Sequence, residues 1–147
     1  MVMTDPKLPN WIADHVQLYL EDPEKAHQWD SSMAGGSGVL PTLLLETVGR
    51  KTGIKRMLPL IYKKVGDDYV IIASKGGFAK HPVWYLNLIH DPQCDIRVGK
   101  DIFSARARVA EGQERNRLWE ELVEIYPPYT AYQEATDRVI PVVVLEV

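Results

Sequence analysis

The sequence predicts a mainly β fold with peripheral helices, in which about six mostly antiparallel strands form a small closed or split barrel. Short apolar runs rich in β-branched residues alternate with glycine-containing turns, which is typical of antiparallel strands joined by hairpins. No long helical segment lies between the successive early runs, and this absence of crossover helices disfavours a doubly wound parallel sheet.

Helices are expected before the first strand. Helical spacing of apolar residues predicts a helix over residues 10–20, and a second, proline-led helix is expected to continue through Trp29. Three glycines and three serines in residues 31–38 predict a mobile connection. We therefore expect an N-terminal helical arm with a flexible linker, residues 1–38, ahead of a compact domain, residues 39–147.

The compact part reads as strands interrupted by three helices. The expected strands cover residues 41–48, 57–65, 69–74, 95–98, 102–110 and 140–146. The expected helices cover residues 81–90 and 113–126, and a short third helix follows the double proline at 127–128.

Composition limits the function classes. The 147 residues carry a formal net charge of −3, which disfavours a general nucleic-acid binder. A single cysteine, Cys94, excludes an intramolecular disulfide, and the four histidines show no familiar metal-ligand spacing. The first residues lack a signal-peptide pattern and no apolar run is long enough to span a bilayer, so we expect a cytoplasmic location and no metal site.

The first candidate site is the turn Gly-Arg-Lys-Thr-Gly at 49–53, followed by Lys55 and Arg56. Four cations therefore fall within seven residues of an acidic chain. The glycines permit a tight turn whose amides, together with Arg50 and Arg56, are suited to grip phosphate or carboxylate oxygens. The alternative is a solvated hairpin tip that charge keeps soluble.

Two further clusters accompany this turn. Ala-Ser-Lys-Gly-Gly at 73–77 ends a strand with glycines that permit close approach of a ligand, or it is simply an exposed turn. Tyr126, Tyr129 and Tyr132 gather three phenols that can stack on a planar ligand and donate hydrogen bonds, or they are ordinary aromatic packing.

Together these motifs resemble the deazaflavin (F420)-dependent nitroreductase and quinone reductase family of actinobacteria. The resemblance runs from about Pro41 to the C-terminus and does not cover the arm. The motifs that carry it are Gly-Arg-Lys-Thr-Gly at 49–53, Ala-Ser-Lys-Gly-Gly at 73–77, Pro-Val-Trp-Tyr-Leu-Asn-Leu at 82–88, Tyr-Pro-Pro-Tyr at 126–129, and Thr-Asp-Arg at 136–138 before Ile-Pro-Val-Val.

The resemblance implies a split β-barrel like that of flavin reductases and pyridoxamine phosphate oxidases. It implies coenzyme F420, an 8-hydroxy-5-deazaflavin whose tail carries a phosphate and several glutamates. The cofactor-binding residues it implies are Arg50, Lys51, Thr52, Arg56, Ser74, Lys75, Gly76, Gly77, Trp84 and Asn87. The catalytic, acceptor-side residues it implies are Ser74, Tyr126, Tyr129 and Tyr132.

We therefore expect an F420-dependent oxidoreductase that passes a hydride to a quinone, nitroaromatic or other planar organic acceptor. One alternative is an FMN-dependent enzyme of the same barrel type, although FMN lacks the glutamate tail that four clustered cations suit. Another is a deazaflavin-binding protein without catalysis. The expected partner is the small-molecule acceptor and not a nucleic acid. For the arm helix, peripheral membrane contact, packing on the core and contact with a second subunit of a homodimer are left open.

Overall fold

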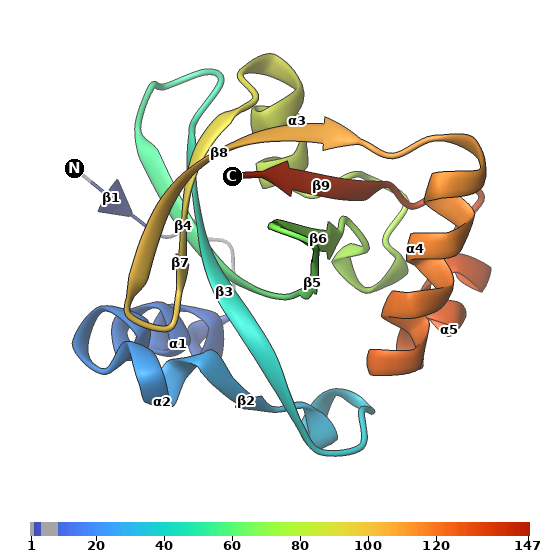
Figure 1. The fold of residues 1–147 in the computed structure, drawn as a ribbon, viewed down its shortest axis with the longest axis horizontal. Helices are drawn as coiled ribbons and strands as arrows, with labels where there is room; N and C mark the ends of the chain where they lie inside the picture. Colours follow the sequence, from blue (N-terminus) through green and yellow to red (C-terminus); the bar gives the residue numbers. More distant parts are fainter. Residues whose placement is uncertain (1, 4–8) are drawn as a thin grey trace.

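The computed structural model describes residues 2–3 and 9–147, in which one strongly curled sheet carries helices on its outer faces (Figure 1). Within this part of the chain, six strands are five residues or longer: β3 (Val39–Val48), β4 (Lys55–Ile61), β6 (Asp68–Ile72), β7 (Gln93–Val98), β8 (Asp101–Val109) and β9 (Val142–Glu146). Three short strands extend the sheet: β1 (Val2–Met3), β2 (Gln28–Asp30) and β5 (Lys63–Val65).

The strands run in the order β1-β4-β3-β7-β8-β9-β6-β5, and β2 pairs with β3. All described pairings are antiparallel except the short parallel pair of β1 and β4. This curled antiparallel sheet with its peripheral helices confirms the predicted split barrel.

The middle of β3 is buried on both faces. Leu43 and Leu45 point into the barrel core, whereas Leu44 points to the other face and packs with Val16 and Tyr19 of the arm. Because successive strand residues alternate between faces, three consecutive buried leucines require a cover on the outside. Helix α1 (Asn10–Glu21) and helix α2 (Pro23–His27) provide that cover.

The arm is held to β3 by hydrogen bonds as well as by packing. The hydroxyl of Tyr19, which is fully buried, donates to the carbonyl of Thr42 at 2.7 Å. The stretch at 31–38 begins with a 3₁₀ helix, η1 (Ser31–Ala34), and the Ser31 hydroxyl donates to the carbonyl of Gly38 at 2.6 Å. The division of the chain at Val39 stays a prediction.

Two expected elements differ in the structure. The second helix was expected to reach Trp29, but it ends at His27 and Trp29 lies in β2 opposite Leu40 of β3. The expected strand 57–65 is two strands, β4 and β5, separated at Tyr62. The reason is topological: β4 pairs with β3 whereas β5 pairs with β6, so the chain must cross between distant parts of the sheet.

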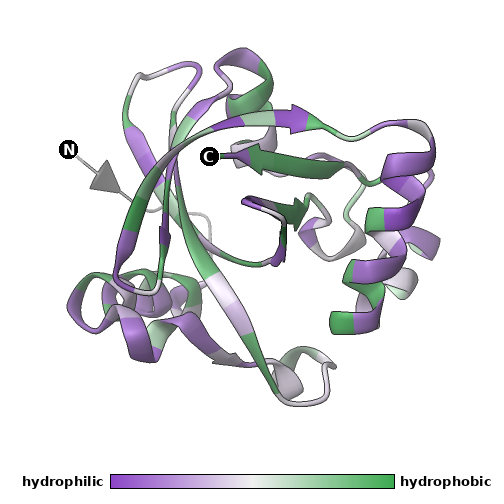
Figure 2. Ribbon diagram, viewed as in Figure 1, coloured by the Kyte–Doolittle hydropathy of each residue, from purple (hydrophilic) through white to green (hydrophobic). Residues whose placement is uncertain are grey.

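The remaining helices cover the other end of the sheet. Helix α3 (Val83–His90) places Trp84 and Leu88 in the barrel core, after the short 3₁₀ helix η2 (Lys75–Gly77). Helix α4 (Gly112–Ile125) and helix α5 (Pro128–Glu134) pack on the outer face of β6 and β9. Strand β9 is accordingly apolar along most of its length, while α4 alternates apolar and polar residues (Figure 2). No helix of the described residues is long and apolar enough to cross a membrane.

Candidate active site

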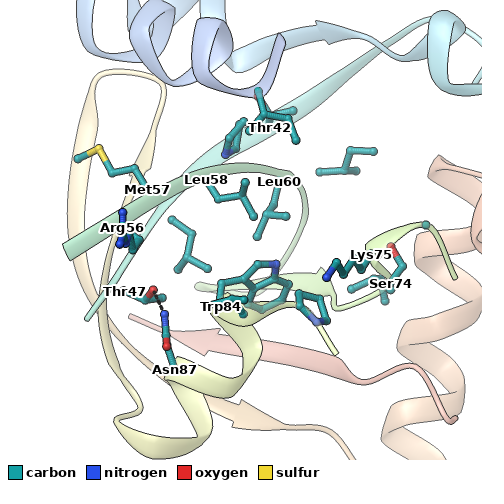
Figure 3. Close-up of a pocket in the computed structure, with 18 of the residues that line it drawn as sticks. Thr42, Thr47, Arg56, Met57, Leu58, Leu60, Ser74, Lys75, Trp84 and Asn87 are labelled. Atoms are coloured by element: carbon teal, nitrogen blue, oxygen red, sulfur yellow. Dashed lines mark hydrogen bonds between the residues drawn. The ribbon is translucent and has the colours of Figure 1, made fainter. Parts of the chain in front are cut away.

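A cavity of about 690 Å³ lies between the strand pair β3 and β4, helix α3, helix α5 and the arm (Figure 3). It contains almost every site residue that the sequence predicted. The predicted residues that line it are Arg50, Lys51, Thr52, Arg56, Ser74, Lys75, Gly76, Trp84, Asn87, Tyr126, Tyr129 and Tyr132. Segments that are up to about eighty residues apart in the sequence therefore meet around one space.

Gly77 is the exception, because it does not line the cavity. Its φ of +82° belongs to the left-handed region, and a Cβ added there would lie 2.5 Å from the carbonyl oxygen of Tyr132. The absence of a side chain thus lets η2 pack directly on the backbone of α5.

The predicted basic turn is closed by its own backbone and by Asn87. The amide of Gly53 donates to the carbonyl of Gly49 at 2.8 Å. Asn87 is 2% exposed; its Oδ1 accepts from the amide of Arg50 at 3.1 Å and its Nδ2 donates to Thr47 Oγ1 at 3.1 Å (Figure 3). Both ends of this buried amide are therefore engaged, and Asn87 fixes the turn to α3 and β3.

The charge of the cavity is opposite to that of the whole chain. Four cationic side chains line it, Arg50, Lys51, Arg56 and Lys75, and none of the lining residues in the described chain is Asp or Glu. No ion pair among residues 9–147 involves Arg50, Lys51 or Lys75. With a net charge of −3 overall, the chain concentrates positive charge where a ligand would enter.

The loop at 73–78 is shaped by Arg138. Its guanidinium donates to the carbonyls of Ala73 at 3.2 Å, Ser74 at 2.7 Å and Phe78 at 2.8 Å. Within this loop Lys75 has a φ of 46°, an uncommon left-handed conformation for a residue with a side chain. Three hydrogen bonds from one planar group thus hold a strained loop against the cavity.

His81 also forms a hydrogen bond with Arg138. Its Nδ1 lies 3.2 Å from an Arg138 nitrogen, and since the guanidinium is always a donor, Nδ1 acts as the acceptor. Burial, and then the positive charge of Arg138, lower the pKa of His81, which favours the neutral ring that this contact requires.

The three tyrosines differ in what their hydroxyls do. Tyr126 donates to the carbonyl of Ala34 at 2.8 Å, so in its contact with Tyr132, also at 2.8 Å, Tyr132 is the donor. The Tyr129 hydroxyl has no hydrogen-bond partner among the described residues, although its ring packs on Tyr126 with centroids 4.9 Å apart. Burial raises the pKa of Tyr129 far above its ordinary value, so the phenol stays neutral and its O–H remains available as a hydrogen-bond donor.

A family model described as F420H(2)-dependent quinone reductase matches residues 21–147. The chain belongs to this family. An F420H(2)-dependent quinone reductase of Mycobacterium tuberculosis is 43% identical over 111 residues, which are 74% of each chain. The family match begins within α1 and therefore includes α2 and β2 of the arm.

Two solved structures extend the comparison. The structure of an F420-H2 dependent reductase is 43% identical, with a TM-score of 0.67 over 72% of this chain and 94% of that chain. A structure described as a domain-swapped dimer is 36% identical, with a TM-score of 0.70 over 93% of this chain and 98% of that chain.

Sequence reasoning missed two groups of residues in this member of the quinone reductase family. Arg138 was noted only within a family motif, because nothing in its spacing indicates that its partners lie about sixty residues away. The second group belongs to the arm and also lines the cavity: Trp11, Ile12, His15 and Trp29. The pairing of β2 with β3, which brings Trp29 there, has no local signal in so short a strand.

Proposed function

We propose that this chain is an F420-dependent oxidoreductase that reduces a quinone or another planar organic acceptor, nitroaromatic compounds included. The observation that carries the proposal is the polarity of the cavity. Strand register places Thr47 opposite Arg56 at one end of the β3–β4 pair and Thr42 opposite Ile61 at the other. The first end carries the basic turn, and the second end adjoins the aromatic residues of the arm and α5.

The residues present suit F420 through the chemistry of their side chains. Arg50, Lys51 and Arg56 supply the cationic donors that a phosphate and several carboxylates require. Leu58, Leu60 and Trp84 line the same cavity and offer apolar surface, of which the indole of Trp84 is flat (Figure 3). When bound, reduced F420 supplies the hydride, and the protein supplies position and electrostatics.

The chain's own contribution to the reaction is to exclude water and to donate a proton or hydrogen bond. Negative charge develops on the acceptor oxygen during reduction, and a neutral phenol at that position stabilises it. Tyr129 is the tyrosine whose hydroxyl proton is uncommitted, and Ser74 at the edge of the cavity is a second hydroxyl. These donors favour catalysis over a role in cofactor storage alone.

Cofactor choice tests the proposal. F420 should bind with a dissociation constant in the micromolar range or tighter, and FMN about tenfold or more weakly, a difference of about 1.4 kcal/mol. Changing both Arg50 and Lys51 to Gln should weaken F420 binding more than FMN binding, because FMN has no glutamate tail for these cations to hold. The difference between the two dissociation constants should therefore become smaller. Fluorescence titration measures both constants, and FMN binding that equals or exceeds F420 binding would refute the assignment.

Three further expectations concern the protein's surroundings. The relative described as a domain-swapped dimer supports a homodimer for this chain. Peripheral membrane contact through α1 has less support, since Val16 and Tyr19 of its apolar face are buried against the sheet. A cytoplasmic location stays a prediction.

A further inference from the structure

Two tryptophans of the arm stack on one another beside the cavity. Trp11 in α1 and Trp29 in β2 have ring centroids 6.0 Å apart and planes inclined by only 10°. Both rings line the cavity, and neither belongs to a buried core cluster. Trp11 is 53% exposed although the indole is a large apolar group, so core packing does not explain the pair.

The pair lies at the end of the cavity that is remote from the basic turn. Trp29 is opposite Leu40, near the start of β3, whereas the turn follows Val48 at the end of that strand. Eight residues of extended strand separate Leu40 from Val48, which is about 27 Å. A ligand whose anionic part is held at the turn therefore points its other end, or its co-substrate, toward the tryptophans.

The arm also connects the pair to the tyrosines. Ala34, five residues after Trp29, accepts the hydrogen bond of the Tyr126 hydroxyl and itself lines the cavity. The tryptophan pair and the tyrosines thus border the same cavity, one from the N-terminal arm and the other from α5. An acceptor beside Tyr129 lies within one continuous cavity with Trp11 and Trp29.

We infer that Trp11 and Trp29 form a specificity subsite for an apolar substituent of the acceptor, separate from the reacting ring. The inference rests on the proposed function for the identity of the reaction. Flat apolar rings with a single N–H each favour an aromatic or alkyl group over a polar one. Three of the four cations of the lining belong to the basic turn and the start of β4 at the opposite end, and the fourth, Lys75, lies on η2 beside α5 and not on the arm.

The test compares two quinones that differ only in an apolar substituent. Trp29→Leu and Trp11→Leu should weaken binding of a naphthoquinone with a long alkyl chain about tenfold, through lost contact area. Binding of menadione, which has no such chain, should stay within about twofold. F420 affinity should not change. Leu20→Ala is the control, because Leu20 lies on α1 like Trp11, is 43% exposed and does not line the cavity.

Binding is read at equilibrium, with and without oxidised F420, so the test needs no turnover. The subsite would be overturned if the variants bound both quinones more weakly to the same extent, or if they lost affinity for F420. Unchanged binding of the alkylated quinone would also overturn it. Thermal unfolding of each variant checks that the arm still folds. Failure of the proposed function appears separately, as absence of turnover of menadione by the wild-type protein.

Discussion

At the scale of single residues, hydrogen-bond direction distinguishes side chains that look alike in the sequence. Tyr126 and Tyr132 form a chain of donors that ends on the carbonyl of Ala34, whereas the hydroxyl of Tyr129 has no such partner in the described chain. The first two hydroxyls therefore stabilise the fold, and the third is available to a ligand.

Replacing Tyr129 by Phe should slow hydride transfer without lowering the stability of the protein. The ring is kept and no intramolecular hydrogen bond is lost, so the melting temperature and the F420 affinity should be unchanged. Loss of the donor should slow single-turnover oxidation of bound reduced F420 by a quinone about tenfold or more. Tyr126→Phe is the matched control for stability, since it removes two hydrogen bonds and should lower the free energy of unfolding by about 1–3 kcal/mol. An unaltered single-turnover rate in Tyr129→Phe would remove this hydroxyl from the mechanism.

Individual site residues were predictable where chemistry is local. Arg50, Lys51 and Lys75 stand out by charge beside glycines, and their place around one cavity agrees with that reading. The role of Asn87 was not predictable, because its partners Thr47 and Arg50 are 40 and 37 residues away. A polar residue on an apolar helix face indicates a buried hydrogen bond, but the sequence does not say to what.

At the scale of elements, the turn and the loop beside the cavity are held by hydrogen bonds from side chains that lie far away in the sequence. Asn87 on α3 holds the turn at 49–53, and Arg138 before β9 holds the loop at 73–78. Both are positioning residues: each fixes a backbone whose neighbouring side chains face the cavity.

Arg138→Lys should weaken F420 binding about tenfold, because an ammonium cannot reproduce three hydrogen bonds from a planar fork and each charge-assisted bond contributes about 1.5–3 kcal/mol. Titration with F420 measures the change, and Arg117→Lys on the exposed side of α4 is the control. If the variant melts at a lower temperature yet binds F420 as well as wild type, Arg138 supports only the fold. Unchanged F420 binding together with an unchanged melting temperature would show that the hydrogen bonds of Arg138 hold neither the loop nor the fold.

The sequence predicted the types of most elements and missed those set by pairing. Glycine turns and β-branched runs located the six longer strands of the described chain. The break at Tyr62 and the strand containing Trp29 were missed because both depend on which strand lies alongside. Leu44 carried a usable signal: three adjacent leucines in a barrel strand require an outer layer, which the arm supplies.

At the scale of the whole molecule, an acidic protein encloses a cationic cavity. The formal charge is −3, yet the described lining has four cations and no carboxylate. The rest of the chain thus carries the excess negative charge, while the field at the cavity attracts a polyanion. Three of the four cations belong to the basic turn and the start of β4, whereas the aromatic rings of the arm and α5 line the other end of the cavity. On our proposal the cofactor tail and the acceptor occupy these two ends.

The most direct test of this account is to mix the wild-type protein with reduced F420 and a menadione-type quinone and to follow the reappearance of oxidised F420. We predict rapid, protein-dependent oxidation that saturates with quinone, and much slower oxidation by Tyr129→Phe at equal cofactor occupancy. Bound reduced F420 that no quinone or nitroaromatic acceptor reoxidises faster than in buffer would contradict the account, and the protein would then be a deazaflavin-binding protein without catalysis.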